Sequence, residues 1–453
     1  MGHSKEDMQQ FESSSIVSGP KGLNVSIPGD KSISHRSMIF GLLSRGTTTV
    51  KGLLEGDDIL ATAEACRKLG AKIIRRDDGV WEVTGVGVGC LSTPHSALDF
   101  GNAGTGSRLM MGVVAGHPIT ATFDGDASLR SRPMKRVLDP LMEMGASVEF
   151  EIDDRLPCKL SGTLNPMPKS FKQKKASAQV KSAILLAALN TPGEVTYIEP
   201  IPTRDHTENM MRGFGANITV TPLEGEEGQQ VGNKIVVTGE KQLTAQDIQV
   251  PSDPSSSAFI IAAALIVPDS DIIIENVLMN ETRIGVITTW LEMGANIEIM
   301  NERLSGGEKI ADLRVQYSEL KGVSVPAERA ASMIDEYPIL AMTAAYATGK
   351  THMQELDELR VKESDRLSAV YNGLIANGVK AEIIGDDLIV HGGAVQGGGI
   401  VETHLDHRIA MCFLILGLQA QTAVAIDDGT MIATSFPEFL DVMNAFGAKI
   451  KGI

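Results

Sequence analysis

The chain has 453 residues, of which 43% are hydrophobic and 22% charged, as in globular proteins of two or more domains. Its formal net charge of −16 excludes a nucleic-acid backbone as the main partner, because phosphate backbones are held by basic faces. The longest apolar run, residues 258–267, is too short to cross a bilayer, and residues 1–15 lack the apolar core of a signal peptide and predict a frayed tail. We therefore expect a cytoplasmic protein. Its four scattered cysteines lack zinc-site spacing and are expected to be buried and reduced: Cys66, Cys90, Cys158 and Cys412.

The first distinctive segment, IPGDKSISHRS at residues 27–37, stands in front of an apolar run that predicts a helix. It brings Lys31, His35 and Arg36 together with three serines. A serine at a helix start is usually only a cap. Cations there oppose the helix dipole and are unfavourable unless an anion compensates them. The segment therefore predicts a site for a small anion.

The same arrangement recurs along the chain. Polar helix starts followed by small-residue apolar helices begin near residues 104, 178, 255, 336 and 406, and each is followed by a strand and a second helix. The second helices end in a Gly-Ala or Gly-Val phrase that leads into another strand. Its glycines are expected to be left-handed helix caps: Gly70, Gly145, Gly215, Gly294, Gly378 and Gly447. Six units of helix, strand, helix and strand predict an α/β fold with two similar domains of three repeated units each.

The boundaries between these domains are marked by prolines. Pro251 and Pro254, with several serines, predict a hinge, and Pro28 stands in a similar context. We expect a tail and first strand over residues 1–27 that pairs with the C-terminal domain, an N-terminal domain over 28–250 and a C-terminal domain over 251–453. The six polar helix starts would then converge on a cleft between the domains.

Two further segments carry dense charge. Residues 126–137 hold four cations around one proline, and residues 358–367 alternate in sign. Lys135 and Arg136 fit an ordinary solvated face, and Glu358 and Asp365 fit an ordinary salt-bridged helix start. The Gly-rich GNAGTG at residues 101–106 lacks the GK[ST] of a nucleotide-binding P-loop.

Seven segments, in order, resemble the 5-enolpyruvylshikimate-3-phosphate synthase family: GDKSISHR, GNAGTG, SLRSRPM, SAQVKSA, IDEYP, RVKESDR and LDHRIAM. SLRSRPM and TSFPEF are more similar to a bacterial branch that includes glyphosate-tolerant members. The resemblance implies the two-domain, inside-out barrel of enolpyruvyl transferases, with the active site in the cleft. It also implies transfer of the enolpyruvyl group of phosphoenolpyruvate to the 5-hydroxyl of shikimate 3-phosphate, with release of phosphate. No metal or organic cofactor, nucleic acid or membrane is implied, and we expect a monomer.

The resemblance assigns roles to matching positions. Those implied to bind shikimate 3-phosphate are Lys31, Ser32, Arg36, Ser177, Ala178, Gln179, Arg204, Asp335 and Lys362. Those implied to bind phosphoenolpyruvate are Lys31, Gly104, Arg132, Gln179, Arg366 and Arg408. Asp335 matches the base at the 5-hydroxyl and Glu363 the proton donor to carbon, with Lys31 or Lys362 assisting. Thr434 stands where some members of the family carry a lysine that contacts phosphoenolpyruvate.

Three other functions compete with this interpretation. A sugar-nucleotide enolpyruvyl transferase shares the fold but is not expected to carry GDKSISHR. An RNA-phosphate cyclase would need a nucleotide site and a basic face, and neither is evident in the sequence. A non-catalytic sensor of small anions could use the arginines but has no need for Asp335 and Glu363.

Overall fold

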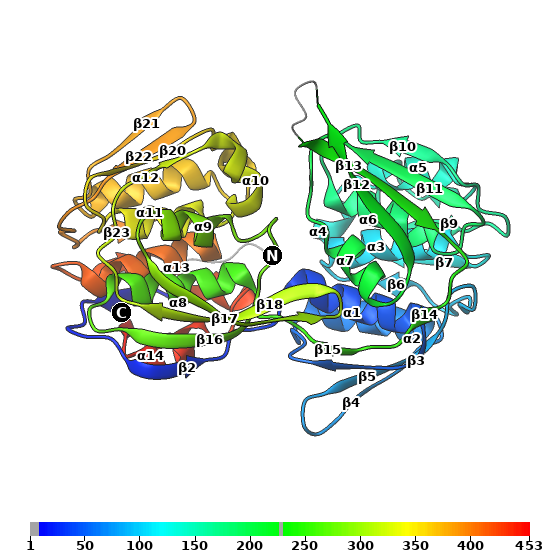
Figure 1. Cartoon of the computed structure of the whole chain (residues 1–453), viewed down its shortest axis with the longest axis horizontal. Coiled ribbons are helices and arrows are strands. Elements are labelled where there is room, and N and C mark those ends of the chain that lie inside the picture. Colours follow the sequence, from blue (N-terminus) through cyan, green and yellow to red (C-terminus); the bar gives the residue numbers. More distant parts are fainter. Residues whose placement is uncertain (1–8, 226–229) are drawn as a thin grey trace. The chain divides into compact units, whose positions relative to one another are not determined.

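The computed structural model describes residues 9–225 and 230–453, which divide into two compact units (Figure 1). Unit 2 contains Gly29–Pro251 together with Leu304–Lys309. Unit 1 contains the described residues up to Pro28, then Ser252–Arg303 and Ile310–Ile453. Leu304–Lys309, which the sequence analysis placed in the C-terminal domain, therefore group with unit 2.

Unit 2 contains three sheets and seven helices among its described residues. The helices are α1 (Lys31–Leu43), α2 (Asp57–Lys68), α3 (Gly104–Ala115), α4 (Ala127–Arg130), α5 (Lys135–Glu143), α6 (Ala178–Ala188) and α7 (His206–Gly213). The strands are β3 (Ser44–Lys51), β4 (Lys72–Arg75), β5 (Trp81–Val86), β6 (Leu98–Asp99), β7 (Thr120–Asp124), β8 (Ser147–Phe150), β9 (Cys158–Ser161), β10 (Ser170–Lys172), β11 (Glu194–Glu199), β12 (Asn217–Glu224), β13 (Gln230–Thr238), β14 (Leu243–Thr244) and β15 (Asp247–Gln249). The sheet orders are β14-β3-β5-β4 with β15 also on β3, β6-β7-β9-β8, and β10-β11-β13-β12.

Unit 1 repeats this plan. Its α-helices are α8 (Pro254–Ile266), α9 (Gly285–Glu292), α10 (Ala330–Met333), α11 (Tyr337–Ala344), α12 (Arg366–Ala376), α13 (His407–Leu416) and α14 (Phe439–Phe446). Short 3-10 helices are η1 (Ala327–Arg329), η2 (Asp357–Val361), η3 (Gly417–Gln419) and η4 (Thr430–Thr434). The strands are β1 (Phe11–Ser14), β2 (Lys21–Val25), β16 (Asp271–Leu278), β17 (Asn296–Ser305), β18 (Glu308–Gln316), β19 (Ser324–Val325), β20 (Lys350–Met353), β21 (Ala381–Ile384), β22 (Asp387–His391), β23 (Ile400–Val401), β24 (Val424–Ile426) and β25 (Lys449–Gly452). The sheet orders are β17-β18-β16-β2, β19-β20-β22-β21 and β23-β24-β1-β25.

The sixfold repeat predicted from the sequence is confirmed. Each sheet joins an edge strand in parallel to the strand that follows a first helix, and adds two antiparallel strands, as in β6-β7-β9-β8. The six glycines predicted as left-handed caps all have positive φ, between 73° and 114°. Beyond the predicted helix, strand, helix and strand, each sheet takes up a strand that lies ahead of a first helix, and five of the six described sheets add a return strand, whereas β23-β24-β1-β25 takes β1 in that place.

Two of the edge strands are exchanged between repeats. β2 precedes α1 but pairs in parallel with β16, which follows α8. β15 precedes α8 but pairs in parallel with β3, which follows α1. The chain passes from unit 1 to unit 2 at Pro28 and back at Pro251. At each passage, the strand just before it stays in a sheet of the unit that the chain is leaving.

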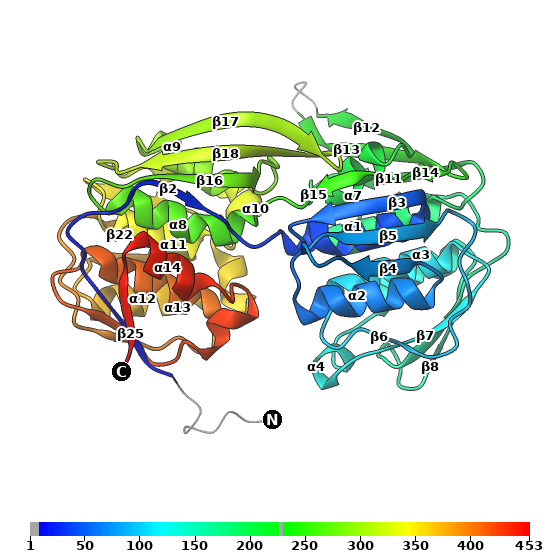
Figure 2. The same ribbon diagram turned by 90° about the horizontal axis from the view of Figure 1, so that it is seen from below.

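The predicted frayed tail is wrong for Phe11–Ser14, which form β1. This strand pairs antiparallel with both β24 and β25, and its Ser13 is fully buried. Figure 2 shows this first strand beside β25. The sequence FESS is short and polar, and its partners lie at the far end of the chain, so no local pattern reveals the strand. Residues 1–8 lie outside the described residues.

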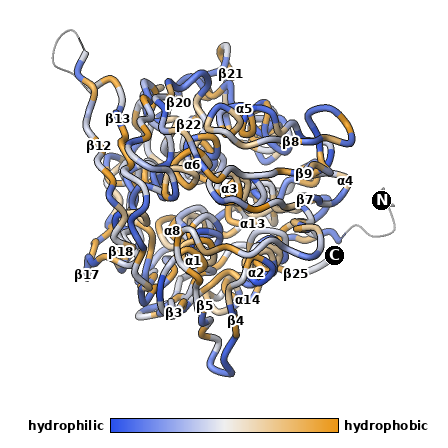
Figure 3. Tube along the Cα trace, turned by 90° about the vertical axis from the view of Figure 1, so that its right-hand side faces the viewer, coloured by the Kyte–Doolittle hydropathy of each residue, from blue (hydrophilic) through white to orange (hydrophobic). Residues whose placement is uncertain are grey.

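The first helices of the repeats form the inside of each unit. All residues of α8 are buried, and α1, α3 and α6 are buried over most of their length, which is typical of helices that are apolar all round. Figure 3 shows the apolar colouring along these helices. Their small residues allow close packing: a Cβ at Gly112 of α3 would lie 2.2 Å from the carbonyl oxygen of Ala183 in α6. The sheets and second helices cover this interior.

Two expectations from composition can be compared with the structure. Cys66, Cys158 and Cys412 are buried as expected, but Cys90 is exposed. It lies in the irregular segment after β5 and not in an interior helix or strand, so the expectation of burial is wrong for it. Within residues 9–225 and 230–453, no helix is long and apolar enough to cross a membrane.

Candidate active site

The start of α1 places the first group of candidate residues in unit 2. Asp30 caps the helix, its carboxylate accepting a hydrogen bond from the Ile33 amide at 2.9 Å. The Lys31 ammonium is half exposed and forms an ion pair with Asp58 of α2. The carbonyl of Ser32 accepts a hydrogen bond from Arg36 Nη1 at 3.0 Å. One turn of helix therefore presents Lys31 to solvent and turns Arg36 inward.

Arg36 is 4% exposed and is held by two other helices. Its Nε donates to Thr207 Oγ1 of α7 at 2.9 Å, and its Nη2 donates to Ser182 Oγ of α6 at 3.1 Å. Burial lowers the pKa of Arg36, although the carboxylate of Glu208 opposes that shift. The guanidinium is thus fixed in place between three helices.

A second group surrounds the start of α3. Arg108 Nη1 donates to Gln179 Oε1 at 3.1 Å, and Gln179 Nε2 donates to Thr105 Oγ1 at 3.0 Å. A Cβ at Gly104 would lie 2.8 Å from Arg132 Nη1 and 3.2 Å from Arg108 Nη1, so the glycine lets both guanidiniums approach the helix start. Burial, with Arg136 and Arg132 nearby, lowers the pKa of Arg108 to about 10. This is a concentrated positive site.

The remaining candidates of unit 2 lie at the starts of α6 and α7. Ser177 caps α6, its hydroxyl accepting from the Val180 amide at 3.4 Å, and Ala178 is the first residue of that helix. Arg204 lies in the irregular segment between β11 and α7. Arg108 is one of the cations that the sequence places at a polar helix start, here that of α3, although the resemblance assigned it no role.

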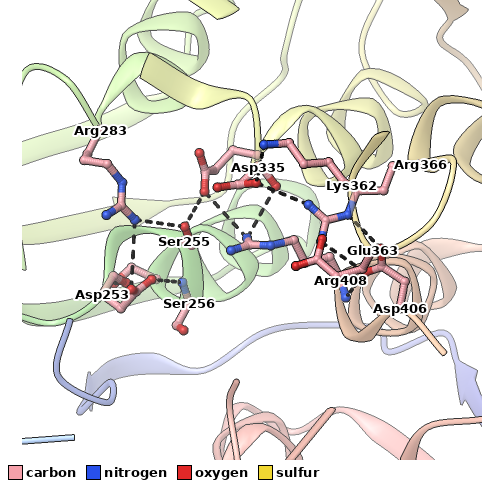
Figure 4. A network of polar contacts seen from close by, with 12 residues as sticks. Asp253, Ser255, Ser256, Arg283, Asp335, Lys362, Glu363, Arg366, Asp406 and Arg408 are labelled. Atoms are coloured by element: carbon pink, nitrogen blue, oxygen red, sulfur yellow. Dashed lines mark hydrogen bonds and ion pairs between the residues drawn. The ribbon is translucent and has the colours of Figure 1, made fainter. Parts of the chain in front are cut away.

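In unit 1, Arg366 joins three carboxylates (Figure 4). Its side chain is fully buried; Nε donates to Asp406 Oδ2 at 2.7 Å, Nη1 to Asp335 Oδ1 at 3.2 Å and Nη2 to Glu363 Oε2 at 2.5 Å. The Lys362 ammonium lies 3.7 Å from Asp335 Oδ1. The structure therefore brings together Asp335, Lys362, Glu363 and Arg366, as a site built on these residues requires.

Arg408 lies at the start of α13 beside this group. Its Nη1 is 3.4 Å from the carbonyl oxygen of Asp335 and 3.6 Å from Glu336 Oε1. Asp406 caps α13 by accepting from the Arg408 amide at 2.9 Å, so one carboxylate contacts both arginines. Burial lowers the pKa of Arg408, but the carboxylates of Asp335 and Glu336 outweigh burial and raise it overall.

Behind Arg408 lies a chain of contacts that the sequence analysis missed. The hydroxyl of Ser255 donates to the buried carboxylate of Glu336 and accepts from Arg283 Nη2 at 3.1 Å. Arg283 Nη2 also lies 3.9 Å from Asp253 Oδ2. In the sequence, Asp253 and Ser255 lie at a predicted helix start, and Glu336 is the neighbour of Asp335. No local sequence pattern marks Arg283.

Thr434, which stands in place of the lysine found in some members of the resembling family, lies at the end of η4. It is exposed, and its hydroxyl donates to the carbonyl of Met431 at 2.6 Å. Among the residues that the structure describes, no group of three or more His, Cys, Asp and Glu side chains is placed to hold a metal ion. The carboxylates of Asp335, Glu336, Glu363 and Asp406 instead face Arg366 or Arg408.

His35 gives unit 2 a predictable acid sensitivity. Its Nδ1 lies 2.8 Å from Thr62 Oγ1, and that hydroxyl donates to the carbonyl of Asp58 at 3.1 Å, so Nδ1 is the protonated nitrogen of a neutral ring. Burial, with Lys31 and Arg36 nearby, lowers the pKa of His35 from 6.5 to about 3.

The unfolded chain therefore binds a proton that the folded chain rejects, and stability present above pH 6.5 is lost as the pH falls towards 3. We expect His35→Asn, whose amide can still donate to Thr62, to remove roughly 2 kcal/mol of the stability loss between pH 7 and pH 5. Urea unfolding at the two pH values measures it. The exposed His95→Asn is the control; equal pH dependence in wild type and His35→Asn would contradict the assignment.

Comparisons with known proteins match one family over nearly the whole chain. The family model for EPSP synthase (3-phosphoshikimate 1-carboxyvinyltransferase) matches residues 19–443. The chain is 61% identical over 426 residues to the 3-phosphoshikimate 1-carboxyvinyltransferase of Methylobacterium radiotolerans, covering 93% of this chain and 94% of the relative. It is 55% identical over 444 residues to that of Parvibaculum lavamentivorans, covering 97% of each. A solved EPSP synthase from Acinetobacter baumannii matches with a TM-score of 0.92 at 40% identity, covering 98% of this chain and 100% of that one. The chain therefore belongs to the EPSP synthase (3-phosphoshikimate 1-carboxyvinyltransferase) family.

Proposed function

We propose that this chain transfers the enolpyruvyl group of phosphoenolpyruvate to the 5-hydroxyl of shikimate 3-phosphate and releases phosphate, a step of aromatic amino acid biosynthesis. Near-complete coverage by relatives named for this activity is the observation that carries the proposal. Phosphate release from the two substrates together, but from neither alone, tests it. The monomeric state and cytoplasmic location expected from the sequence are part of the same proposal, and light scattering tests the first.

The residues of unit 2 support binding of two anionic substrates. Arg36 is fixed by Thr207 and Ser182, which suits recognition of a phosphate by a rigid guanidinium. We assign Lys31, Ser32, Arg36, Ser177, Ala178, Gln179 and Arg204 to shikimate 3-phosphate. Lys31, Gly104, Arg132 and Gln179 contribute to phosphoenolpyruvate.

The residues of unit 1 supply the remaining roles. Arg366 and Arg408 bind phosphoenolpyruvate, and Lys362 and Asp335 contact shikimate 3-phosphate. Because Asp335 and Glu363 both contact the guanidinium of Arg366, their carboxylates are held within reach of one set of reacting atoms. The reaction therefore depends on where Arg366 holds these two carboxylates as much as on the net charge of unit 1.

The chemistry requires two proton transfers in each half of the reaction. Asp335 removes the proton of the 5-hydroxyl as its oxygen attacks the central carbon of phosphoenolpyruvate, and Glu363 delivers a proton to the methylene carbon. Elimination from the tetrahedral intermediate reverses both transfers: Glu363 takes a proton from the methyl group as the C–O bond to phosphate breaks, and Asp335 gives up its proton to the leaving phosphate. Lys31 or Lys362 assists these transfers by stabilising the charge that develops.

The alternatives make different predictions for the same assay. A transferase that acts on a sugar nucleotide would release phosphate with that acceptor and not with shikimate 3-phosphate. An RNA-phosphate cyclase would need a nucleotide. A sensor of small anions would bind the substrates without consuming them, and would leave the paired carboxylates around Arg366 without a function.

Glyphosate sensitivity is expected to depend on Gly104. In the resembling family this position lies against phosphoenolpyruvate or glyphosate, and tolerant members can carry alanine there. A methyl group at Gly104 would lie 2.8 Å from Arg132 Nη1 and would displace that guanidinium. We expect Gly104→Ala to raise the inhibition constant of glyphosate, the longer ligand, by a larger factor than KM for phosphoenolpyruvate. Steady-state kinetics with and without glyphosate measures both constants. An equal increase in the two would show that Gly104 does not contact glyphosate.

A further inference from the structure

Thr203, the residue before Arg204, is bound by the buried carboxylate of Glu199 and the buried ammonium of Lys181. Glu199 Oε1 accepts hydrogen bonds from the Thr203 amide at 3.0 Å and from Thr203 Oγ1 at 2.5 Å. Lys181 Nζ donates to the carbonyl of Thr203 at 3.3 Å. Thr203 lies in the irregular segment between β11 and α7, so these contacts fix a backbone that no helix or sheet orders.

The groups that bind Thr203 form a charged cluster inside unit 2. Lys181 Nζ lies 2.9 Å from Glu199 Oε1 and 2.7 Å from Glu208 Oε1, and the three side chains are at most 3% exposed. Glu208 Oε2 is buried without a hydrogen-bond partner, and burial raises the pKa of Glu208. Buried ion pairs often stabilise a fold less than apolar side chains of the same size would. The role of this cluster is therefore better explained by the groups that it holds in position than by a contribution to the stability of the fold.

The cluster is continuous with the residues that hold Arg36. Ser182, next to Lys181, accepts from Arg36 Nη2, and Thr207, next to Glu208, accepts from Arg36 Nε. The positive charge of Arg204 is among the causes of the lowered pKa of Arg36, so Arg204 lies close enough to this cluster to interact with it.

We propose that Glu199 and Lys181 are positioning residues for Arg204, which hold the backbone of Thr203 so that Arg204 meets the anionic group of shikimate 3-phosphate. The inference rests on the proposed function, because it takes the ligand of Arg204 from there. A merely structural cluster would change stability and would affect both substrates alike. A positioning cluster changes the affinity for one substrate through one arginine.

Thr203 offers the sharpest substitution. Thr203→Val keeps the shape and the amide but removes the Oγ1 donor to Glu199, whereas Thr203→Ser keeps that donor. We expect Thr203→Val to raise KM for shikimate 3-phosphate roughly tenfold, as for loss of one hydrogen bond to a charged group. KM for phosphoenolpyruvate and kcat should change less than about twofold, and Thr203→Ser should stay close to wild type.

Glu199→Gln tests the carboxylate itself. Glutamine keeps the shape of Glu199 but removes the charge that strengthens both hydrogen bonds from Thr203, so the hold on Thr203 weakens. Lys181 keeps Glu208 as its partner, so the fold should survive. The matched control is Glu194→Gln, an exposed glutamate at the other end of β11. We expect the rise in KM for shikimate 3-phosphate with Glu199→Gln and not with Glu194→Gln. A similar rise in both variants, or in KM for both substrates, would overturn the proposal.

A double-mutant cycle tests whether the effect passes through Arg204. In an Arg204→Ala background, Thr203→Val should change KM for shikimate 3-phosphate less than about twofold, because the positioned group is gone. The same roughly tenfold change in both backgrounds would overturn the proposal. Unchanged KM in Thr203→Val, with active wild type, overturns this inference alone. Absence of phosphate release by the wild type overturns the proposed function and this inference together.

Discussion

Turnover of Asp335→Asn is expected to fall by roughly 10² to 10⁴, the contribution of a general base, with binding of both substrates largely intact. The amide has the shape of the carboxylate and can still accept from Arg366 Nη1, which lies 3.2 Å from Asp335 Oδ1. It cannot take the proton of the 5-hydroxyl. Steady-state turnover, with binding of each substrate measured by calorimetry, separates the chemical step from binding.

A purely structural Asp335 predicts the opposite result. If the carboxylate served only to pair with Arg366 and Lys362, its loss would lower the free energy of unfolding by more than the roughly 1 kcal/mol of a surface pair, because Arg366 is fully buried, and would leave turnover nearly unchanged. Asp365→Asn is the matched control, because Asp365 caps α12 by accepting from the Ser368 amide at 3.1 Å and is exposed. Asparagine caps a helix as well as aspartate, so that variant should lose at most about 1 kcal/mol, through its exposed ion pair with Arg360 and the helix dipole, and keep its activity.

Glu363→Gln is expected to lower turnover by a similar factor, roughly 10² to 10⁴, for a different reason. The glutamine can still accept from Arg366 Nη2 but cannot deliver a proton to the methylene carbon. Solvent deuterium should therefore stop exchanging into the methylene carbon of phosphoenolpyruvate during turnover. Mass spectrometry of that carbon measures the loss, and Asp335→Asn gives the comparison for a variant that is slow at the hydroxyl.

Glu358→Gln provides the control for Glu363→Gln. Glu358 is an exposed carboxylate in η2, only a few residues away, and its substitution should leave turnover unchanged. If both Asp335→Asn and Glu363→Gln kept more than about a tenth of wild-type turnover, acid–base roles of the expected size would be wrong. The two carboxylates would then act mainly by holding Arg366.

The first helices were predictable because their signal is local. One repeat contains the whole signal: a polar start, a run of small apolar residues and, two elements later, a left-handed glycine. Five of the six first helices begin within one residue of the predicted position. The exception is α1, which begins at Lys31, seven residues before the apolar run that starts at Met38. The cause is Asp30, whose cap on the Ile33 amide nucleates the helix earlier.

The features that escaped prediction depend on partners far away in the chain. β1 owes its existence to β24 and β25, and β15 pairs with β3 and not with the strands next to it in sequence. In the site, the motifs gave Asp335, Glu363 and Arg366 but not Glu199. That carboxylate ends an ordinary strand, and only the fold reveals that it binds Lys181 and Thr203.

The exchanged edge strands also order events on the ribosome. β2 emerges early, yet its partner β16 is made about 250 residues later, and β1 waits more than 400 residues for β24 and β25. At roughly 5 to 20 residues per second, the wait of β1 lasts about 20 to 80 s. For the first 250 residues or so of that wait unit 2 acquires nearly all of its own strands, while β1 and β2 upstream of it have nothing to pair with. The low strand propensity of β1, which hid it from prediction, makes that nascent segment a poor partner for a wrong neighbour.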